Sequence, residues 1–137
     1  VITMKGIIIV THSNMANGTK EAAEMIVGEQ ENFYALGFYV GEGLEDLHSK
    51  IQKIIDENNC DEWIIFTDMF GATPANVSSI IATENKATVI TGFNLGMILE
   101  CVALRDSVET KELVSQLTDT DNLGIRYIDK DIILNNN

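Results

Sequence analysis

Short runs of β-branched and other apolar residues alternate along the chain with longer segments whose apolar residues recur at helical spacing. Apolar runs rich in valine and isoleucine predict buried strands, and an apolar residue at every third or fourth position predicts an amphipathic helix. The predicted strands are residues 6–11, 33–40, 62–67, 87–91 and 124–128, and the predicted helices are residues 19–27, 43–58, 74–83, 94–104 and 109–117. Strand and helix therefore follow one another along most of the chain.

This alternation predicts an α/β fold with a parallel sheet. The first strand contains the continuous apolar run Ile7-Ile8-Ile9-Val10, which is typical of a strand covered on both faces. Right-handed crossovers place the intervening helices on the two faces of such a sheet. We therefore expect an open, mostly parallel twisted sheet in the order 2-1-3-4 with helices on both faces, and a single domain over residues 1–137.

The strand order determines where chemistry is expected. In open parallel sheets, ligands bind beyond the carboxyl ends of the strands, at the point where the strand order reverses. In the order 2-1-3-4 the first and third strands flank that point. His12 follows the first strand and Asp68 follows the third, so we expect both side chains in one crevice.

A histidine beside a carboxylate forms a candidate nucleophilic site. The carboxylate accepts a hydrogen bond from one ring nitrogen, fixes the tautomer and leaves a lone pair on the other nitrogen. His12 is therefore the candidate catalytic nucleophile, and Asp68 is the residue that orients it. A histidine at a strand end is often an incidental loop residue, and only the matching position of Asp68 supports the catalytic interpretation.

The loop after Asp68 has the composition of an anion-binding helix start. Gly71 and Ala72 allow close approach of the backbone, and Thr73 is predicted as the N-cap before Pro74, the single proline of the chain. A helix N-terminus offers N–H groups and the positive end of its dipole to an anion. We expect Gly71, Ala72 and Thr73 to bind phosphate, although an ordinary capped helix would also explain Thr73 and Pro74.

Charge and missing motifs exclude several classes of function. Nine lysines and arginines against 21 aspartates and glutamates give a net charge of −12, which disfavours nucleic acid as a partner. The charge either steers the protein toward a basic partner or only keeps it soluble. The sequence has no Walker A loop, no dinucleotide fingerprint, no nucleophile elbow and no metal-type spacing, so we expect no metal and no cofactor.

The opening residues contain no signal peptide, and no apolar run is long enough to span a membrane. We therefore expect a cytoplasmic protein with Cys60 and Cys101 as reduced thiols.

Three segments together resemble a known family. GIIIVTHS, IIFTDMFGATPANVSS and VITGFNLGMILE are similar, in this order, to the IIA proteins of the mannose-type (mannose/fructose/sorbose) sugar phosphotransferase system, the PTS. The resemblance covers about residues 6–105, and its second segment is the most specific. Two positions depart from it, since Ser13 stands where the family often has glycine and Gly96 where proline is common.

The resemblance implies a phosphotransferase with a phosphohistidine intermediate. His12 would carry the phosphoryl group on Nε2, Asp68 would bond the other ring nitrogen, and Thr73 with the amides around Gly71–Thr73 would hold the phosphoryl oxygens. The donor would be the phosphocarrier protein HPr, and the acceptor a IIB protein that serves a membrane IIC/IID permease. The family fold adds an antiparallel edge strand exchanged within a homodimer, for which residues 124–128 are the candidate.

Other interpretations remain open at this point. A dihydroxyacetone kinase uses a related phosphotransfer subunit, although the Thr-Pro-x-Asn helix start favours the sugar-uptake branch. A regulatory module that is phosphorylated as a signal and a flavodoxin-like domain that binds a small anion are two further alternatives. Met69 and Phe70, beside Asp68, form either an apolar docking patch or part of the core.

Overall fold

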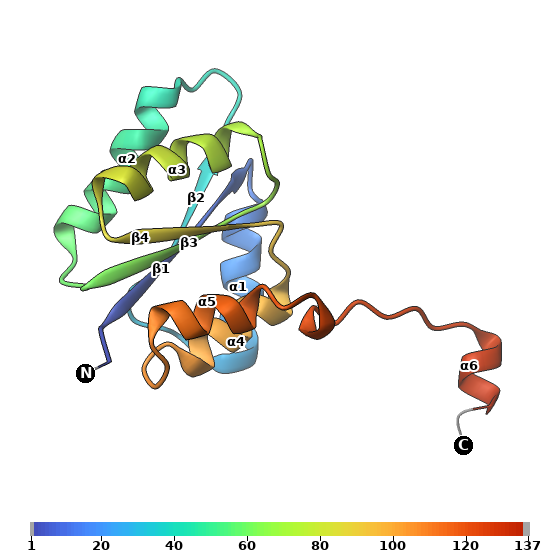
Figure 1. The fold of residues 1–137 in the computed structure, drawn as a ribbon. Coiled ribbons are helices and arrows are strands. Elements are labelled where there is room, and N and C mark those ends of the chain that lie inside the picture. The colour runs from blue at the N-terminus through green and yellow to red at the C-terminus, as the bar shows by residue number, and fades with distance from the viewer. Residues whose placement is uncertain (1, 136–137) are drawn as a thin grey trace.

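The computed structural model describes residues 2–135, and a parallel sheet lies at its centre (Figure 1). The strands β1 (Lys5–His12), β2 (Phe33–Phe38), β3 (Glu62–Thr67) and β4 (Ala87–Thr91) form a 4-stranded sheet in the order β2-β1-β3-β4. All three pairings are parallel. The predicted fold class and strand order are therefore confirmed, and β3 and β4 have the predicted bounds.

Helices cover both faces of the sheet (Figure 1). On one face lie α1 (Met15–Val27), α4 (Leu95–Leu104) and α5 (Thr110–Leu117). On the other face α2 (Leu44–Glu57) packs beside α3 (Thr73–Glu84). A short 3₁₀ helix (Thr120–Asn122) and α6 (Lys130–Asn135) follow α5.

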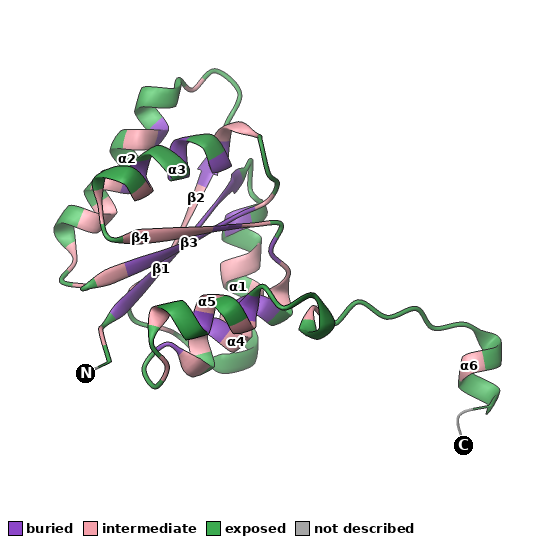
Figure 2. Cartoon of the chain, viewed as in Figure 1, coloured by how far each residue is buried: buried purple, intermediate pink, exposed green. Residues whose placement is uncertain are grey.

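The central strand β1 contributes to two separate cores. Ile7 and Ile9 pack into the cluster under α1, α4 and α5, whereas Ile8 and Val10 pack into the cluster under α2 and α3. All four side chains are fully buried, and the same holds for most of β3 (Figure 2). Successive residues of a strand point to opposite faces, so a continuous apolar run is what a two-sided core requires.

Two buried cations, Lys5 and Arg105, lie at the amino end of β1, opposite to the end that holds His12. The Lys5 Nζ donates hydrogen bonds to the carbonyl oxygens of Arg105 (3.0 Å) and Thr3 (3.1 Å). The Arg105 guanidinium donates to the carbonyl oxygens of Lys5, Glu31 and Asn32. Because these bonds satisfy the charges without a carboxylate, they tie the start of β1 to the end of α4.

The helix α1 begins earlier than the sequence predicts. Its first residue is Met15 rather than residue 19, and Ala16 in its first turn is fully buried. Gly18 and the polar residues next to it weaken the helical pattern in this turn, which is why periodicity becomes visible only from Thr19. The earlier start matters for the site, because α1 begins within three residues of His12.

The predicted last strand is absent from the described part of the chain. Residues 124–128 form neither helix nor strand, and in Figure 1 they lead away from the sheet toward α6. Ile125, Tyr127 and Ile128 are exposed by 76%, 78% and 74%. An extended segment becomes a strand only beside a hydrogen-bonding neighbour, and among residues 2–135 this segment has no such neighbour. The expected antiparallel edge strand is therefore not formed within residues 2–135.

Candidate functional site

His12 and Asp68 meet at the carboxyl edge of the sheet, as the sequence predicts. His12 is the last residue of β1, and Asp68 follows the last residue of β3. The Oδ2 atom of Asp68 lies 2.6 Å from the ring Nδ1 of His12 and also accepts a hydrogen bond from the backbone N–H of His12 at 3.0 Å. The parallel register pairs Val10 with Thr67, so the two side chains leave neighbouring strands side by side.

The carboxylate is shielded and the imidazole is accessible. The Asp68 side chain is 12% exposed and the His12 side chain 48%. Burial of Asp68 disfavours its charged form, but hydrogen bonds from the ring and the backbone N–H of His12 outweigh it and lower the pKa of Asp68. An ionised Asp68 makes Nδ1 the donor, which leaves a lone pair on Nε2. Nε2 makes no hydrogen bond to any residue of 2–135.

Thr11 and Ser13 hold the turn that follows His12. The buried hydroxyl of Thr11 donates to the carbonyl oxygen of His12 at 3.0 Å and accepts the N–H of Ala16 at 2.8 Å. Ser13 has a φ of 50°, in the left-handed region, and its N–H donates to the carbonyl oxygen of Phe38 at 2.8 Å. These bonds connect the end of β1 to α1 on one side and to the end of β2 on the other.

Two residues at the end of β2 also contact this turn, and neither is among the site residues predicted from the sequence. A Cβ at Gly37 would lie 2.3 Å from the carbonyl oxygen of Ser13 and 2.6 Å from the ring of Tyr39. The Tyr39 hydroxyl donates to Oδ1 of Asn14 at 2.7 Å. The available signal was the glycine inside an apolar strand, because such a glycine often marks a place where another backbone approaches closely.

The predicted phosphate loop starts α3, but its cap differs from the prediction. Ala72 is the N-cap, with an extended backbone, and Thr73 and Pro74 are the first two residues of the helix. The prediction that Thr73 is the N-cap is therefore wrong, because Ala72 keeps an extended backbone and Thr73 already belongs to the helix. No side chain of residues 2–135 caps this helix start, and Gly71 has a φ of 80°.

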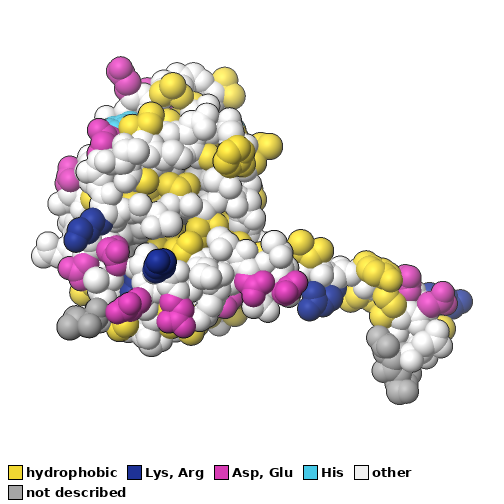
Figure 3. All heavy atoms as spheres, in the orientation of Figure 1, with side chains coloured by type: hydrophobic (Ala, Val, Ile, Leu, Met, Phe, Trp, Pro, Cys, Tyr) yellow, Lys and Arg dark blue, Asp and Glu magenta, His cyan; other side chains and the backbone are white. Residues whose placement is uncertain are grey.

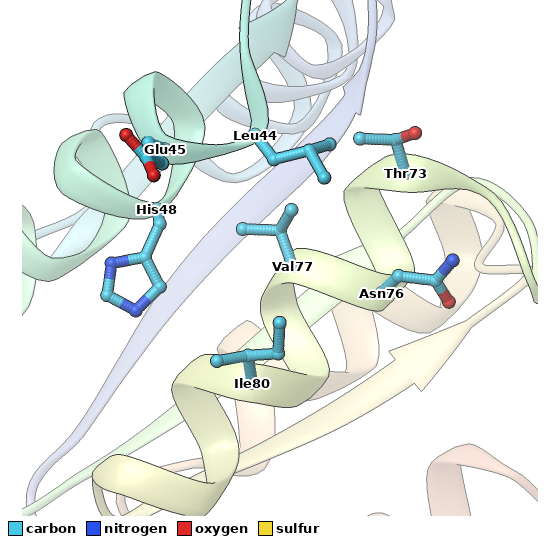
Figure 4. Close-up of a pocket in the computed structure, with 7 residues that line it drawn as sticks. All are labelled: Leu44, Glu45, His48, Thr73, Asn76, Val77 and Ile80. Carbon is cyan, nitrogen blue, oxygen red and sulfur yellow. The ribbon is translucent and has the colours of Figure 1, made fainter.

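The surface around the site has two hollows. One, of about 530 Å³, is lined by His12, Ser13 and residues 38–42. The other, of about 230 Å³, lies between α2 and α3, where Leu44 faces Val77 across the groove and Thr73 stands at one end (Figure 4). His48 lines this second groove, and its Nε2 is hydrogen-bonded to Oε1 of Glu84 at 2.8 Å. It takes no part in the contacts of His12.

Met69 and Phe70 are exposed beside Asp68. Their exposed fractions are 57% and 87%, so neither belongs to the core. The alternative that they are core residues is therefore wrong, and they form part of the surface that surrounds the imidazole.

Among residues 2–135 there is no group of three or more histidine, cysteine, aspartate or glutamate side chains that could hold a metal ion. Over the same residues, no helix combines the length and the apolar character that crossing a membrane would require.

Comparisons with known proteins point to one family. The family model of the PTS system fructose IIA component (EIIA-man) matches residues 6–118. The sorbose-specific EIIA component of Lacticaseibacillus casei is 38% identical over 112 residues, 81% of each chain. The fructose-specific EIIA component of Bacillus subtilis is 33% identical over 83% of this chain and 80% of its own length.

A solved structure supports the same family. The phosphotransferase system component EIIA from Streptococcus agalactiae superposes with a TM-score of 0.83 and 32% identity, covering 90% of this chain and 97% of that protein.

Proposed function

The chain belongs to the EIIA-man family of sugar phosphotransferase systems, and we propose that it carries the phosphoryl group on Nε2 of His12. EIIA components are phosphotransferases that act as phosphoryl carriers in sugar uptake. The observation that supports His12 best is its 2.6 Å bond from Nδ1 to Asp68, because that bond leaves Nε2 as the basic nitrogen on an accessible edge of the ring.

The transfer step follows from this tautomer. The Nε2 lone pair attacks the phosphorus of a phosphohistidine on the donor, a new N–P bond forms, and the donor's N–P bond breaks with its electron pair returning to the donor's imidazole. The proton on Nδ1 of His12 stays in place, so the phosphorylated ring is cationic. Asp68 stabilises this positive charge through its ionised carboxylate.

Residues 71–73 are proposed to hold the oxygens of the phosphoryl group. Gly71, Ala72 and Thr73 lead into the N-terminus of α3, which no side chain of the described residues caps. Unpaired N–H groups and the positive end of the helix dipole stabilise an anion at such a position. Phosphoryl transfer depends mainly on positioning and on electrostatic stabilisation, which this loop would supply without a metal or cofactor.

The proposed donor is phosphorylated HPr, and the proposed acceptor is a IIB protein that serves a IIC/IID permease. Both partners must reach the same nitrogen, and the half-exposed His12 ring fits this requirement. Met69 and Phe70 give the partner an apolar contact beside the site. The net charge of −12 favours a partner with a basic patch. We place this exchange in the cytoplasm, with transient association at the permease.

The exposed C-terminal segment supports the further proposal of a homodimer. Figure 3 shows hydrophobic side chains on the segment that extends away from the body of the molecule. Ile125, Tyr127 and Ile128 in this segment are exposed. Apolar side chains gathered on an exposed segment mark an interaction surface. In a homodimer, residues 124–128 would pair with a sheet edge of the second copy and become the antiparallel edge strand that the single chain lacks.

The main competing function is the phosphotransfer subunit of a dihydroxyacetone kinase. The family match and the named relatives are PTS components, which favours the sugar-uptake function over this alternative and over a regulatory module. Incubation of the phosphorylated protein with each acceptor separates the two enzymes, since only a IIB protein should remove the phosphoryl group.

The proposal is tested with radiolabelled phospho-HPr as donor. We expect the label to transfer to the wild-type protein, to be acid-labile and base-stable, and to be absent from His12→Ala. His48→Ala is the matched control, because its histidine lies in the groove between α2 and α3 and should leave labelling unchanged. Labelling of His12→Ala at the wild-type level would contradict the assignment.

A further inference from the structure

Asn14 does not use its side chain as an asparagine at a helix N-cap ordinarily does. Such a side chain normally accepts an N–H from the first turn of its own helix. The N-cap of α1 is Asn14, but the N–H of Ala16 is accepted by Thr11 at 2.8 Å, and Asn14 makes no cap bond. Instead, Oδ1 of Asn14 accepts the Tyr39 hydroxyl at 2.7 Å, across from the end of β2.

The hydrogen bond between Tyr39 and Asn14 spans a turn whose backbone conformation is unfavourable for the residues in it. Ser13, between His12 and Asn14, has a φ of 50°, and a residue other than glycine keeps that conformation only where its surroundings hold it. The Tyr39 ring lies over Gly37, whose missing side chain also admits the carbonyl oxygen of Ser13. Tyr39 therefore contacts the turn through both its ring and its hydroxyl.

Tyr39 is itself anchored to α2. The N–H of Glu42 donates to the carbonyl oxygen of Tyr39 at 3.1 Å, with Gly41 at a φ of 91°, which closes a tight turn. The Glu42 carboxylate accepts the N–H of Tyr39 at 2.9 Å and also pairs with Lys50 of α2. A chain of contacts thus runs from Lys50 through Glu42 and Tyr39 to Asn14.

We propose that Tyr39 is a positioning residue for His12: its hydroxyl bond to Asn14 holds the Ser13 turn in the one geometry in which both the ring and the backbone N–H of His12 reach Asp68. This inference rests on the proposed role of His12. A single oxygen, Oδ2 of Asp68, accepts both bonds from His12, so a small rotation of the turn weakens one of them. Without the hydroxyl, the turn samples more conformations. A smaller fraction of the molecules then has the His12 ring in the geometry that leaves Nε2 free to react.

The test is Tyr39→Phe, which keeps the ring over Gly37 and removes only the hydroxyl. We expect the labelling rate at saturating phospho-HPr to fall about five-fold, the effect of losing one ordinary hydrogen bond, while the half-saturating donor concentration stays unchanged. Asn14→Leu removes the acceptor and should cause the same loss, whereas Asn14→Asp keeps an acceptor and should keep the rate. The double variant Tyr39→Phe/Asn14→Leu should be no slower than either single variant.

A second readout does not depend on phosphorylation. Nitrogen NMR of the His12 ring in mildly alkaline buffer reports the fraction of imidazole protonated on Nδ1, and this fraction should fall in Tyr39→Phe. A purely structural tyrosine would lower the melting temperature without moving the tautomer.

Tyr34→Phe is the matched control. The Tyr34 hydroxyl makes the same kind of hydrogen bond, to Oδ1 of Asn58 at 2.7 Å, and Tyr34 lies on β2, the strand that Tyr39 follows. Tyr34 pairs with Ile8 whereas Phe38 pairs with His12, which places Tyr34 about 13 Å from the site end of the strand. We expect Tyr34→Phe to change neither the labelling rate nor the tautomer.

The outcomes separate this inference from the proposed function. A wild-type rate and tautomer in Tyr39→Phe, together with normal labelling of His12, would overturn the positioning role alone. A rise in the half-saturating donor concentration with an unchanged rate at saturation would overturn it too, because Tyr39 would then act in docking of the donor. A wild-type protein that phospho-HPr does not label contradicts the proposed function, and the tautomer measurement then decides the role of Tyr39.

Discussion

Oδ2 of Asp68 accepts two hydrogen bonds from His12, one from the ring Nδ1 at 2.6 Å and one from the backbone N–H at 3.0 Å. The second hydrogen bond joins the carboxylate to the main chain of His12. The position of Asp68 is therefore fixed relative to the end of β1 and not only relative to the imidazole ring. The other carboxylate oxygen accepts the N–H of Met69 at 3.1 Å. Asp68 is therefore held in place before any partner binds, which is the preorganisation that a transfer site needs.

Replacing the carboxylate with an amide tests this role. In Asp68→Asn the ring loses its ionised partner, and we expect the rate of labelling by phospho-HPr to fall about ten- to a hundred-fold, as the loss of a charged hydrogen bond implies. Circular dichroism should show a folded protein, because the side chain remains the same size. A labelling rate equal to that of the wild type would mean that Asp68 does not activate His12.

The same carboxylate should contribute to acid sensitivity. Hydrogen bonds from His12 keep the pKa of Asp68 below its ordinary value despite burial, whereas in the unfolded chain an aspartate titrates at about pH 4. The unfolded state therefore binds the proton first, and the stabilisation is complete above that pH and is lost as the pH falls through the folded pKa.

Urea unfolding at a series of acidic pH values measures this effect. The stability of the wild-type protein should fall more steeply with acid than that of Asp68→Asn, which has no group to protonate at this position. Parallel curves for the two proteins would contradict the lowered pKa.

Two glycines should respond to alanine in opposite directions. At Gly37 the added Cβ would lie 2.3 Å from the Ser13 carbonyl oxygen, so Gly37→Ala should lower the free energy of unfolding by about 2–3 kcal/mol. At Gly18, inside α1, the Cβ would meet nothing within 4 Å, and Gly18→Ala should raise it by about 0.5–1 kcal/mol. Chemical denaturation of the two variants checks both signs, and a neutral Gly37→Ala would show that the turn can move away.

These positions show how far the sequence alone predicts the site. The meeting of His12 and Asp68 was predictable, because in the expected order 2-1-3-4 both residues stand at the carboxyl ends of neighbouring parallel strands. The contact of Gly37 with Ser13 was not, since it depends on the path of a loop in three dimensions. Residues 124–128 have the composition of a strand, but a strand also needs a neighbour, which lies outside what one chain's sequence specifies.

Phe70 should contribute to partner binding rather than to stability. Its side chain is 87% exposed, so Phe70→Ala should leave the melting temperature unchanged and raise the half-saturating concentration of phospho-HPr about five- to ten-fold. Met25→Ala is the control: Met25 is 89% exposed but sits in the last turn of α1, at the end of the helix away from His12. An equal effect of both variants would argue against a docking patch at Phe70.

The exposed C-terminal segment should control assembly. Ile125→Glu combined with Ile128→Glu places charges where the proposed homodimer buries apolar side chains, and we expect the molar mass from light scattering to shift from dimer to monomer. Urea unfolding of the monomeric variant should still be cooperative, because neither residue belongs to the two cores. A wild-type protein that is monomeric at every concentration would contradict the homodimer.

The length of β1 restricts how this part of the chain can vary in evolution. Its 8 residues run from Lys5, anchored by Arg105, to His12, and they alternate between the two cores. Inserting or deleting one residue would exchange the buried sides of every position after the change and would turn the imidazole to the opposite face of the sheet. Homologues that keep the reaction should therefore show substitutions in this strand but no gaps, and gaps should collect in loops that are remote from both cations and from the histidine.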